Sequence, residues 1–305
     1  MSPGISVHIP VYNQPQRLQQ CLGSVQKQLL RPAEVLIIDD ASTVDYSRVL
    51  HLFPELNIKY VRNSTNLGPL QNMLRALHYP TGSDYVNVFH EDDLMHKDFL
   101  KQSLAALESA KESLFSWCEI GFHKQASSPV YQHRGGKWRE VDQRTLTALL
   151  LEGKSLGFGT VVYRKSRLAG QAFDLNHFSV LADRPFLLSM LDRSKAIVLE
   201  DVLVSVNAHE EEDTRWSNLK EEHVYHLHTC YKSMFPGRFA RLSKKLRAGF
   251  SRSMLDVYRL LPAENKVPLA VFVLKAWFRG LISLKYTLLT IPRFRNMAKK
   301  IQGIR

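Results

Sequence analysis

Short apolar runs alternate with stretches of helical periodicity along the first third of the chain. Short apolar runs predict strands at residues 5–9, 35–38, 58–61 and 85–89. The run at residues 35–38 is continuous, which predicts a central strand covered on both faces. Apolar residues three or four positions apart predict helices after Asn13, at residues 69–78 and at residues 97–110. Asn13 is expected to cap the first helix, with Pro15 in its first turn. This alternation indicates βαβ units around a mostly parallel sheet, an α/β fold.

The middle of the chain is less regular, but the same patterns continue. Apolar runs predict further strands at residues 115–119, 160–164, 196–199 and 202–206. Helical spacing predicts helices at residues 143–151 and 182–191.

The positive charge is concentrated at the C-terminal end of the chain. The formal net charge is +12, and residues 238–305 hold 16 of the 41 Lys and Arg residues but only two of the 29 acidic residues. The preceding part is therefore close to neutral. Such an asymmetry predicts a separate acidic partner for the basic region.

The basic region contains an apolar, aromatic-rich stretch at residues 269–292. Lys275, Arg279 and Lys285 interrupt it, and each charge at a bilayer centre costs about 2.5–3.5 kcal/mol, which argues against a spanning helix. An amphipathic segment lying on an anionic membrane surface through residues 238–305 fits better. The alternative is that its apolar side packs on the protein body. Residues 246–261 also place apolar residues on one helical face. Nucleic acid is not expected as a partner, because no recognised binding module accompanies the charge.

Cysteine usage indicates a reducing compartment. Cys21, Cys118 and Cys230 are widely spaced and odd in number, so they predict no disulfide framework and no metal-ligand spacing. The first predicted strand begins at Ile5, which leaves no room for the apolar region of a signal peptide. We therefore expect a cytoplasmic protein, peripheral on the inner face of the cytoplasmic membrane.

An acidic cluster, His90-Glu91-Asp92-Asp93, directly follows the strand predicted at residues 85–89. Open α/β sheets bind ligands outside the carboxyl ends of their strands. Oxygen ligands suit Mg²⁺ or Mn²⁺, and such an ion in turn suits a diphosphate. The alternative is a solvated acidic turn before the next helix.

Four motifs, each at the carboxyl end of a predicted strand or at the start of a helix, occur in order at residues 9–13, 37–42, 66–69 and 89–93. Together they resemble a family 2 glycosyltransferase over about residues 5–210. The resemblance implies the GT-A fold, a three-layer α/β/α domain with a mostly parallel central sheet. We expect this catalytic domain at residues 1–210, followed by a basic, α-helical C-terminal extension at residues 211–305.

The resemblance also implies roles for single residues. Asp39 and Asp40 fall where the family contacts the nucleotide, although both also suit helix capping beside Ser42. The full set expected at the donor is Pro10, Tyr12, Asn13, Asp39, Asp40, Asn66, Gly68, His90 and Glu91. Metal ligands are expected at Asp92, Asp93 and His209. His90 stands where the family's acidic motif has its first Asp.

The acceptor hydroxyl must lose a proton as it attacks the sugar, so a general base is required. By resemblance this base is Asp183, which follows Ala182 where the family commonly has Glu; the alternative is a helix cap. Attack from the face opposite the diphosphate predicts inversion of anomeric configuration. Residues 157–159 resemble a glycine-containing turn that precedes an acceptor-facing strand.

These observations favour an inverting, metal-dependent enzyme that moves a sugar from a nucleotide-sugar donor, foremost a UDP-sugar, to a glycan or lipid-linked acceptor in polysaccharide or lipopolysaccharide synthesis. A catalytically inactive, membrane-docked partner of another transferase is the alternative, favoured by His90 and Ala182. A sugar-phosphate nucleotidyltransferase would need a Gly-rich phosphate loop after the first strand, and residues 10–14 form none. P-loop kinases and dinucleotide oxidoreductases are excluded because their glycine motifs are absent.

Overall fold

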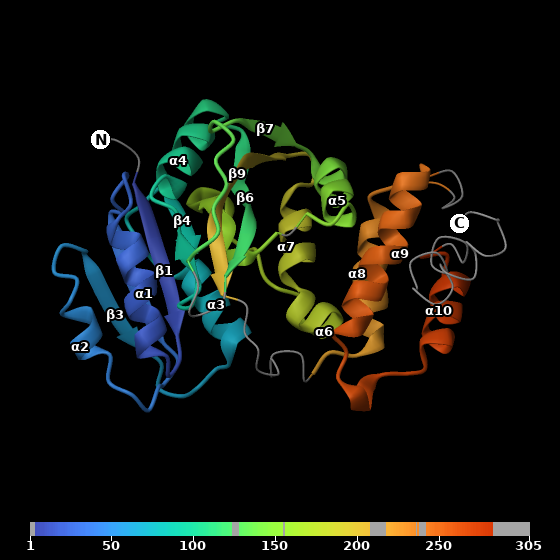
Figure 1. Ribbon diagram of the computed structural model, residues 1–305, viewed down its shortest axis with the longest axis horizontal. Coiled ribbons are helices and arrows are strands. Elements are labelled where there is room, and N and C mark those ends of the chain that lie inside the picture. Colours follow the sequence, from blue (N-terminus) through green and yellow to red (C-terminus); the bar gives the residue numbers. More distant parts are fainter. Residues whose placement is uncertain are drawn as a thin grey trace. The chain divides into compact units, whose positions relative to one another are not determined.

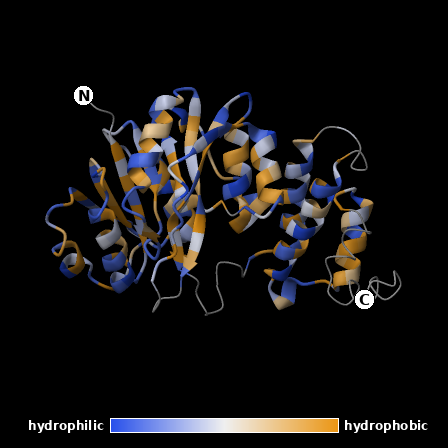
Figure 2. Cartoon of the chain, turned by 45° about the horizontal axis from the view of Figure 1, so that its top comes forward, coloured by the Kyte–Doolittle hydropathy of each residue, from blue (hydrophilic) through white to orange (hydrophobic). Residues whose placement is uncertain are grey.

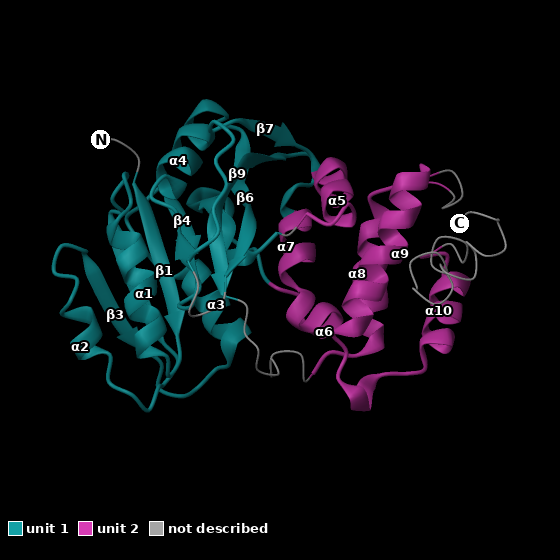
Figure 3. Cartoon of the chain, in the orientation of Figure 1, with its two compact units in different colours: residues 1–142, 155–172, 190–212 teal, residues 143–154, 173–189, 213–305 magenta. Residues whose placement is uncertain are grey.

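A computed structural model describes residues 4–123, 128–154, 156–207, 218–235, 237 and 242–282 (Figure 1). Contacts divide the chain into two compact units (Figure 3). Unit 1 comprises residues 1–142, 155–172 and 190–212, and unit 2 comprises residues 143–154, 173–189 and 213–305. The units interleave along the chain, so the expected division at residue 210 is not tested by them and stays a prediction.

Unit 1 contains one sheet, which has nine strands in the part of the chain that the structure describes. The strands are β1 (Ile5–Val11), β2 (Glu34–Asp39), β3 (Ile58–Arg62), β4 (Tyr85–Val88), β5 (Leu94–Met95), β6 (Ser113–His123), β7 (Trp138–Val141), β8 (Val161–Arg164) and β9 (Lys195–Asn207). Their order is β3-β2-β1-β4-β8-β6-β9-β5, and β7 also pairs with β9. Strands β1 to β4, β6 and β9 share one direction, whereas β5, β7 and β8 oppose it. The prediction of a mostly parallel α/β sheet is confirmed.

Helices cover both faces of this sheet. Side chains of α1 (Pro15–Gln26), α2 (Ser47–Leu50) and α4 (Phe99–Ser109) share a buried core with Ile5, Val7 and Ile9 of β1. His8, between Val7 and Ile9, lies on the other face of the sheet because successive side chains of a strand alternate. There its Nδ1 atom lies 2.6 Å from the carbonyl oxygen of Ala76 in α3 (Pro69–His78). The expected α/β/α layering is confirmed.

The strand register brings the loops of the first half to one edge. Val11 at the end of β1 pairs with Asp39 at the end of β2, and Asp39 pairs with Arg62 at the end of β3. Strand β4 is parallel to β1 and ends at Val88, opposite His8. The segments that follow these four strands therefore share the carboxyl edge of the sheet, as the motif order required.

Two local predictions are wrong. Asn13 does not cap α1: its backbone has a φ of 57°, and its side-chain Oδ1 accepts hydrogen bonds from the backbone N–H and hydroxyl of Thr43 at 2.8 and 3.1 Å. The strands expected at residues 196–199 and 202–206 form one continuous strand, β9. Its register against β6 shifts near Glu119, so an irregular pairing accommodates the polar residues between the two apolar runs.

Unit 2 is helical in its described residues. It contains α5 (Gln143–Leu151), α6 (Leu175–Phe178), α7 (Asp183–Met190), α8 (Glu221–Ser233), α9 (Lys244–Arg259) and α10 (Leu269–Phe278). The predicted apolar stripe of α9 is buried, including Phe250 and Met254, and α9 packs on α5 and α8. A side chain at Gly249 would place its Cβ 2.6 Å from the Leu151 carbonyl oxygen, so this approach requires glycine. This part of the basic region is thus structural.

Helix α10 differs from α9 because it leaves apolar side chains exposed. Val271, Leu274, Trp277 and Phe278 are all exposed, Phe278 by 79%, and Figure 2 shows how strongly apolar this helix is. Within the described ranges, every helix falls short of the length and apolarity that a bilayer-spanning helix needs.

A buried histidine in α8 makes unit 2 sensitive to acid. His228 is fully buried, with Nδ1 at 2.8 Å from the Val224 carbonyl oxygen and Nε2 at 3.2 Å from the Ser253 hydroxyl. Burial and the charge of Arg184 together lower the pKa of His228 from 6.5 to about 4, against the Val224 bond. Between pH 6.5 and 4, His228 is therefore protonated in the unfolded chain but stays neutral in the folded chain. Stability is lost as pH falls through that window, on the order of 3 kcal/mol.

His228→Gln is expected to remove most of this acid-dependent loss, because glutamine does not titrate. Urea unfolding followed by circular dichroism at pH 4 to 7 measures it. His226→Gln, on the same helix but exposed, should keep the wild-type pH dependence. An unchanged pH profile in His228→Gln would contradict the assignment.

Candidate functional site

Asp39, the last residue of β2, organises the turn that follows it. Its side chain is fully buried and accepts hydrogen bonds from the Ser42 N–H at 2.9 Å and the Tyr60 hydroxyl at 2.6 Å. The Arg62 guanidinium lies 3.6 Å away. Burial and the bond to Asp39 raise the pKa of Tyr60 to about 12, so its hydroxyl stays a donor. Asp39 therefore makes the turn contact expected of a cap, and its contact with a nucleotide stays a prediction.

Asp40 holds the loop that leads into α3. One carboxylate oxygen accepts from the Asn63 amide at 2.7 Å and from the Leu67 N–H at 2.8 Å, and the other accepts from the Gly68 N–H at 2.9 Å. Gly68 has a φ of 81°, a backbone conformation that favours glycine. The Asn66 side chain also accepts from the Gly68 N–H at 2.9 Å. Asp40, Asn66 and Gly68 thus form one rigid loop at the edge of the sheet.

Asp40→Ala should lower the free energy of unfolding by about 3 kcal/mol, because it leaves buried donors without their charged acceptor. Urea unfolding measures this loss. Asp45→Ala is the matched control, since the Asp45 carboxylate is exposed and bonds only to the nearby Ser47 among the contacts described. A loss below about 0.5 kcal/mol for Asp40→Ala would show that the loop is held by other contacts.

The acidic cluster follows β4 at the same edge. His90, Asp92 and Asp93 each offer a ligand atom, and these atoms lie within 4.8 Å of one another. The His90 Nδ1 is 3.2 Å from the Asp93 carboxylate, whose other oxygen accepts from the Asn207 N–H at 3.1 Å. Burial raises the pKa of Asp93 and the charge of Asp92 raises it further, against His90 and Asn207. Because the carboxylates of Asp92 and Asp93 lie close together and are at least partly buried from solvent, they favour a bound cation.

Glu91 ties this cluster to the end of β1. Its Oε1 accepts from the Tyr12 N–H at 2.9 Å, while its Oε2 is buried and accepts no hydrogen bond from any residue that the structure describes. Burial raises the pKa of Glu91 to about 8, and Asp92 and Asp39 add to this, against Tyr12 and Arg17. The Tyr12 side chain is 46% exposed, so its ring is open to a ligand.

Asn13 and Pro10 complete the β1 side of the edge. The Asn13 N–H donates to the Ser42 hydroxyl at 3.0 Å, which joins the loops after β1 and β2. Pro10 lies within β1, opposite Ile38 of β2. The residues expected to bind the donor, together with Asp92 and Asp93, therefore gather along one edge of unit 1.

Two expected site residues do not belong to the described part of unit 1. His209 lies outside the described residues, although Asn207, two positions earlier, donates to Asp93. Asp183 begins α7 in unit 2, and its Oδ1 accepts from the Arg184 N–H at 2.8 Å. The role of each stays a prediction.

The sequence reading missed polar residues that support the edge. The Asn63 amide, just after β3, also donates to the Asn72 side chain at 3.1 Å, and the Asn72 amide donates to the Ile38 carbonyl at 3.0 Å. Asn72 is buried, but α3 also carries Gln71, Arg75 and His78, so the sequence alone gave no signal that set Asn72 apart. Gly159, in the turn expected near the acceptor, lies against the cluster: a Cβ there would be 3.8 Å from the Asp93 Oδ2.

Comparison with known families decides the classification. Residues 6–165, just over half of the chain, match the model of glycosyl transferase family 2. The chain belongs to glycosyl transferase family 2. Its motifs at residues 9–13, 37–42, 66–69 and 89–93 all lie within the matched region.

Curated family members are similar over parts of the chain. An abequosyltransferase of Salmonella typhimurium is 38% identical over 117 residues, covering 36% of this chain and 33% of the relative. A GalNAc(5)-diNAcBac-PP-undecaprenol beta-1,3-glucosyltransferase of Campylobacter jejuni is 25% identical over 175 residues, covering 56% and 55%. The matches thus span about a third to a half of these relatives' lengths.

Solved structures share the fold over nearly the whole chain. TarS 1-349 of S. aureus in complex with UDP-GlcNAc matches with a TM-score of 0.61 at 18% identity, over 98% of this chain and 92% of that one. The mannosyltransferase PcManGT from Pyrobaculum calidifontis, in complex with GDP-Man and Mn²⁺, matches with a TM-score of 0.56 at 16% identity, over 100% and 89%. The GT-A fold expected from the sequence is therefore confirmed.

Proposed function

We propose that this chain is an inverting glycosyltransferase that moves a sugar from a nucleotide-sugar donor, foremost a UDP-sugar, to a glycan or lipid-linked acceptor. The observation that carries the proposal is the convergence of the family motifs and the acidic cluster on one edge of the sheet. A solved neighbour of the same fold is described with UDP-GlcNAc, which supports the class of donor.

The cluster suits a divalent cation, and Mg²⁺ or Mn²⁺ is the proposed cofactor. Asp92 and Asp93 supply hard oxygen ligands and His90 supplies a nitrogen, a set that fits Mn²⁺ in particular. His209 is proposed as a further ligand. When bound, the ion neutralises charge on the diphosphate that leaves. A solved neighbour described with GDP-Man and Mn²⁺ supports this choice.

The loops beside the cluster are proposed to hold the nucleotide. The exposed Tyr12 ring offers a face on which a base stacks. Asp39 and Asp40 fix the backbone of the loops after β2 and before α3, so their carboxylates act on the donor from pre-formed positions. Glu91 orients the Tyr12 backbone through its own hydrogen bond.

Asp183 is the proposed general base. It accepts the proton of the acceptor hydroxyl as that oxygen attacks the anomeric carbon, and the nucleoside diphosphate leaves from the opposite face. The new glycosidic bond then has the inverted configuration. Asp183 is the first residue of α7.

The acceptor is proposed to be a glycan carried on a lipid. The Campylobacter relative is named for action on an undecaprenol-linked glycan, and an Erwinia amylovora relative, 32% identical over 108 residues, is named for amylovoran biosynthesis. These names support a role in polysaccharide or lipopolysaccharide synthesis, and we propose that it takes place at the inner face of the cytoplasmic membrane.

Helix α10 is proposed to place the enzyme on that surface. Its exposed apolar residues sit beside Lys275 and Arg279 in the basic region, and apolar burial together with anionic lipid drives such binding. Deleting residues 238–305 would also remove α9, which packs in unit 2, so point variants give a cleaner test.

The double variant Trp277→Ser/Phe278→Ser should bind vesicles containing phosphatidylglycerol at least about tenfold more weakly, because two large apolar side chains are lost. Vesicle flotation measures this. The control Leu29→Ser/Leu52→Ser removes two comparably exposed apolar residues from unit 1 and should float like the wild type. Equal flotation of both double variants would reject the role of α10.

The activity itself is tested by incubating the full chain with a panel of nucleotide sugars and Mn²⁺ and measuring released nucleoside diphosphate. One donor should be turned over well above the others, and a chelator should stop the release. No release from any donor, with and without candidate acceptors, would favour the inactive-partner alternative.

A further inference from the structure

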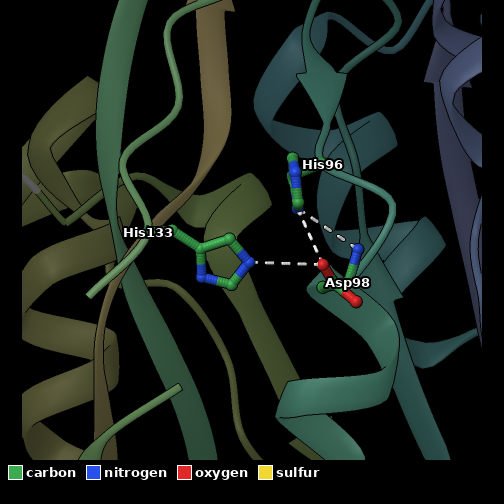
Figure 4. A group of neighbouring side chains, drawn as sticks. All are labelled: His96, Asp98 and His133. Carbon is green, nitrogen blue, oxygen red and sulfur yellow. Dashed lines mark hydrogen bonds and ion pairs between the residues drawn. The ribbon is translucent and has the colours of Figure 1, made fainter. Parts of the chain in front are cut away.

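A second group of potential metal ligands lies in unit 1, outside the acidic cluster. Its members are His96 just after β5, Asp98 just before α4, and His133 in the segment that leads to β7 (Figure 4). Their ligand atoms lie within 4.8 Å of one another. Two imidazoles and one carboxylate form a set typical of zinc sites.

The two distances from the Asp98 carboxylate match a coordination shell better than hydrogen bonds, although the His96 Nδ1 also accepts a long hydrogen bond of 3.4 Å from the Asp98 backbone N–H. The Asp98 Oδ2 lies 3.4 Å from the His96 Nδ1 and 3.4 Å from the His133 Nε2. Ligands about 2.0–2.1 Å from a tetrahedral ion are separated by about 3.3–3.4 Å. Hydrogen bonds to oxygen are usually shorter, near 2.9 Å. Figure 4 shows both imidazoles directed at the same carboxylate oxygen.

The Asp98 side chain does not cap helix α4. Asp98 directly precedes α4, where an Asp usually caps the helix through its side chain. Its side chain makes no such capping bond and is directed to the two histidines instead.

A buried carboxylate contacts the second ring nitrogen of His133. The His133 Nδ1 lies 2.7 Å from the Asp201 carboxylate, whose side chain is fully buried. Asp201 is itself held by the Gln102 amide at 3.0 Å and the Arg134 N–H at 2.7 Å. A histidine that binds a metal usually donates its other ring N–H to such a carboxylate. Nε2 is thereby left as the atom available to a metal.

The geometry points to a Zn²⁺ site formed by His96 Nδ1, Asp98 Oδ2 and His133 Nε2, with Asp201 as the carboxylate that orients His133. Three protein ligands leave one tetrahedral position for water. His133 is 56% exposed, so an ion reaches the site from solvent.

By binding both His133 and Asp98, the ion would link the segment around His133 to the start of α4. Among its described backbone contacts, that segment has the bridge between Gln132 and Val202 and the bond from the Val130 N–H to the Ser205 hydroxyl. A metal that binds only the folded arrangement adds to its stability. The role is structural and independent of sugar transfer.

Zinc titration of the full chain tests the site. After chelator treatment and dialysis, calorimetry with ZnCl₂ should show a site that His133→Ala weakens at least about 100-fold, since loss of a supporting group alone costs about 10–100-fold. Asp201→Asn should fall in that smaller range. Asp92→Ala should keep this site, because its ligands do not include the acidic cluster. His51→Ala, which removes another exposed histidine, should also keep it.

Two further readouts separate a metal site from a plain ion-pair network. Co²⁺ should give the visible bands of a four-coordinate ion in the wild type but not in His133→Ala. Zn²⁺ should raise the melting temperature of the wild type by a few degrees and leave that of His133→Ala unchanged. Zinc binding that is equal in the two proteins would overturn the proposal. So would a melting temperature that His133→Ala lowers equally with and without zinc.

Discussion

Asp92→Ala should reduce kcat/KM for sugar transfer about 1000-fold, equivalent to about 4 kcal/mol of transition-state stabilisation. The reason is that Asp92, with Asp93 and His90, forms a group of potential metal ligands at the carboxyl edge of the sheet, where we propose that a cation and the diphosphate bind. Affinity for the donor should fall as well, because an ion held by Asp92 would neutralise charge on the bound diphosphate. Steady-state kinetics and calorimetry with nucleoside diphosphate and Mn²⁺ measure the two effects.

Asp45→Ala is the matched control for this variant. Asp45 is an exposed carboxylate in the loop after β2, outside the acidic cluster, and its loss should leave both quantities within about twofold. If Asp92→Ala retained metal-stimulated transfer near the wild-type rate, the acidic cluster would not be the metal site.

Asp183→Asn should lower kcat by about 100- to 10,000-fold and leave donor affinity unchanged, because a general base acts only as the acceptor loses its proton. Asparagine keeps the shape and the acceptor oxygen but cannot take up the proton. Calorimetry with the donor, and single-turnover transfer to acceptor, separate binding from chemistry.

Asp174→Asn supplies the control within unit 2, since Asp174 is an exposed carboxylate that pairs with His177. A folded Asp183→Asn protein with wild-type kcat would place the base elsewhere. The contrast between Asp92→Ala and Asp183→Asn also assigns the two carboxylates separately: one should affect donor binding and catalysis, the other catalysis alone.

Much of the fold was predictable because its central strands are buried on both faces. The run at residues 35–38 is apolar at every position, and β2 indeed lies between β1 and β3. The helices α3 and α5 begin and end at the predicted residues, because their apolar stripes stop where the chain turns. In these segments local pattern and tertiary burial agree.

The errors arose where a distant partner overrides local preference. Asn13 is a residue type that often caps helices, but its side chain instead accepts a hydrogen bond from the Thr43 N–H in the next loop. The acidic pair Glu200-Asp201 suggested a break between two strands. Instead Asp201 is satisfied by Gln102 and by the loop at Arg134, so β9 continues through it. No sequence window contains those partners.

The site was predictable in outline and not in detail. The ordered motifs identified which loops share an edge, since parallel strands end together. The capping contact of Asp39 with Ser42 was an alternative from the sequence, but the distant partners Tyr60 in β3 and Asn63 just after it could not be read from it. The numbers of Lys and Arg likewise did not distinguish α9, whose apolar side is buried, from α10, which buries Phe272, Val273 and Ala276 but leaves its other apolar side chains exposed.

The most direct measurement is a crystal structure of the full chain with Mn²⁺ and UDP, using the anomalous signal of manganese to locate the ion. The account predicts a manganese peak bonded to Asp92, with the diphosphate against it and the base beside Tyr12. A nucleotide bound without manganese at Asp92, or a peak at another part of the chain alone, would contradict it.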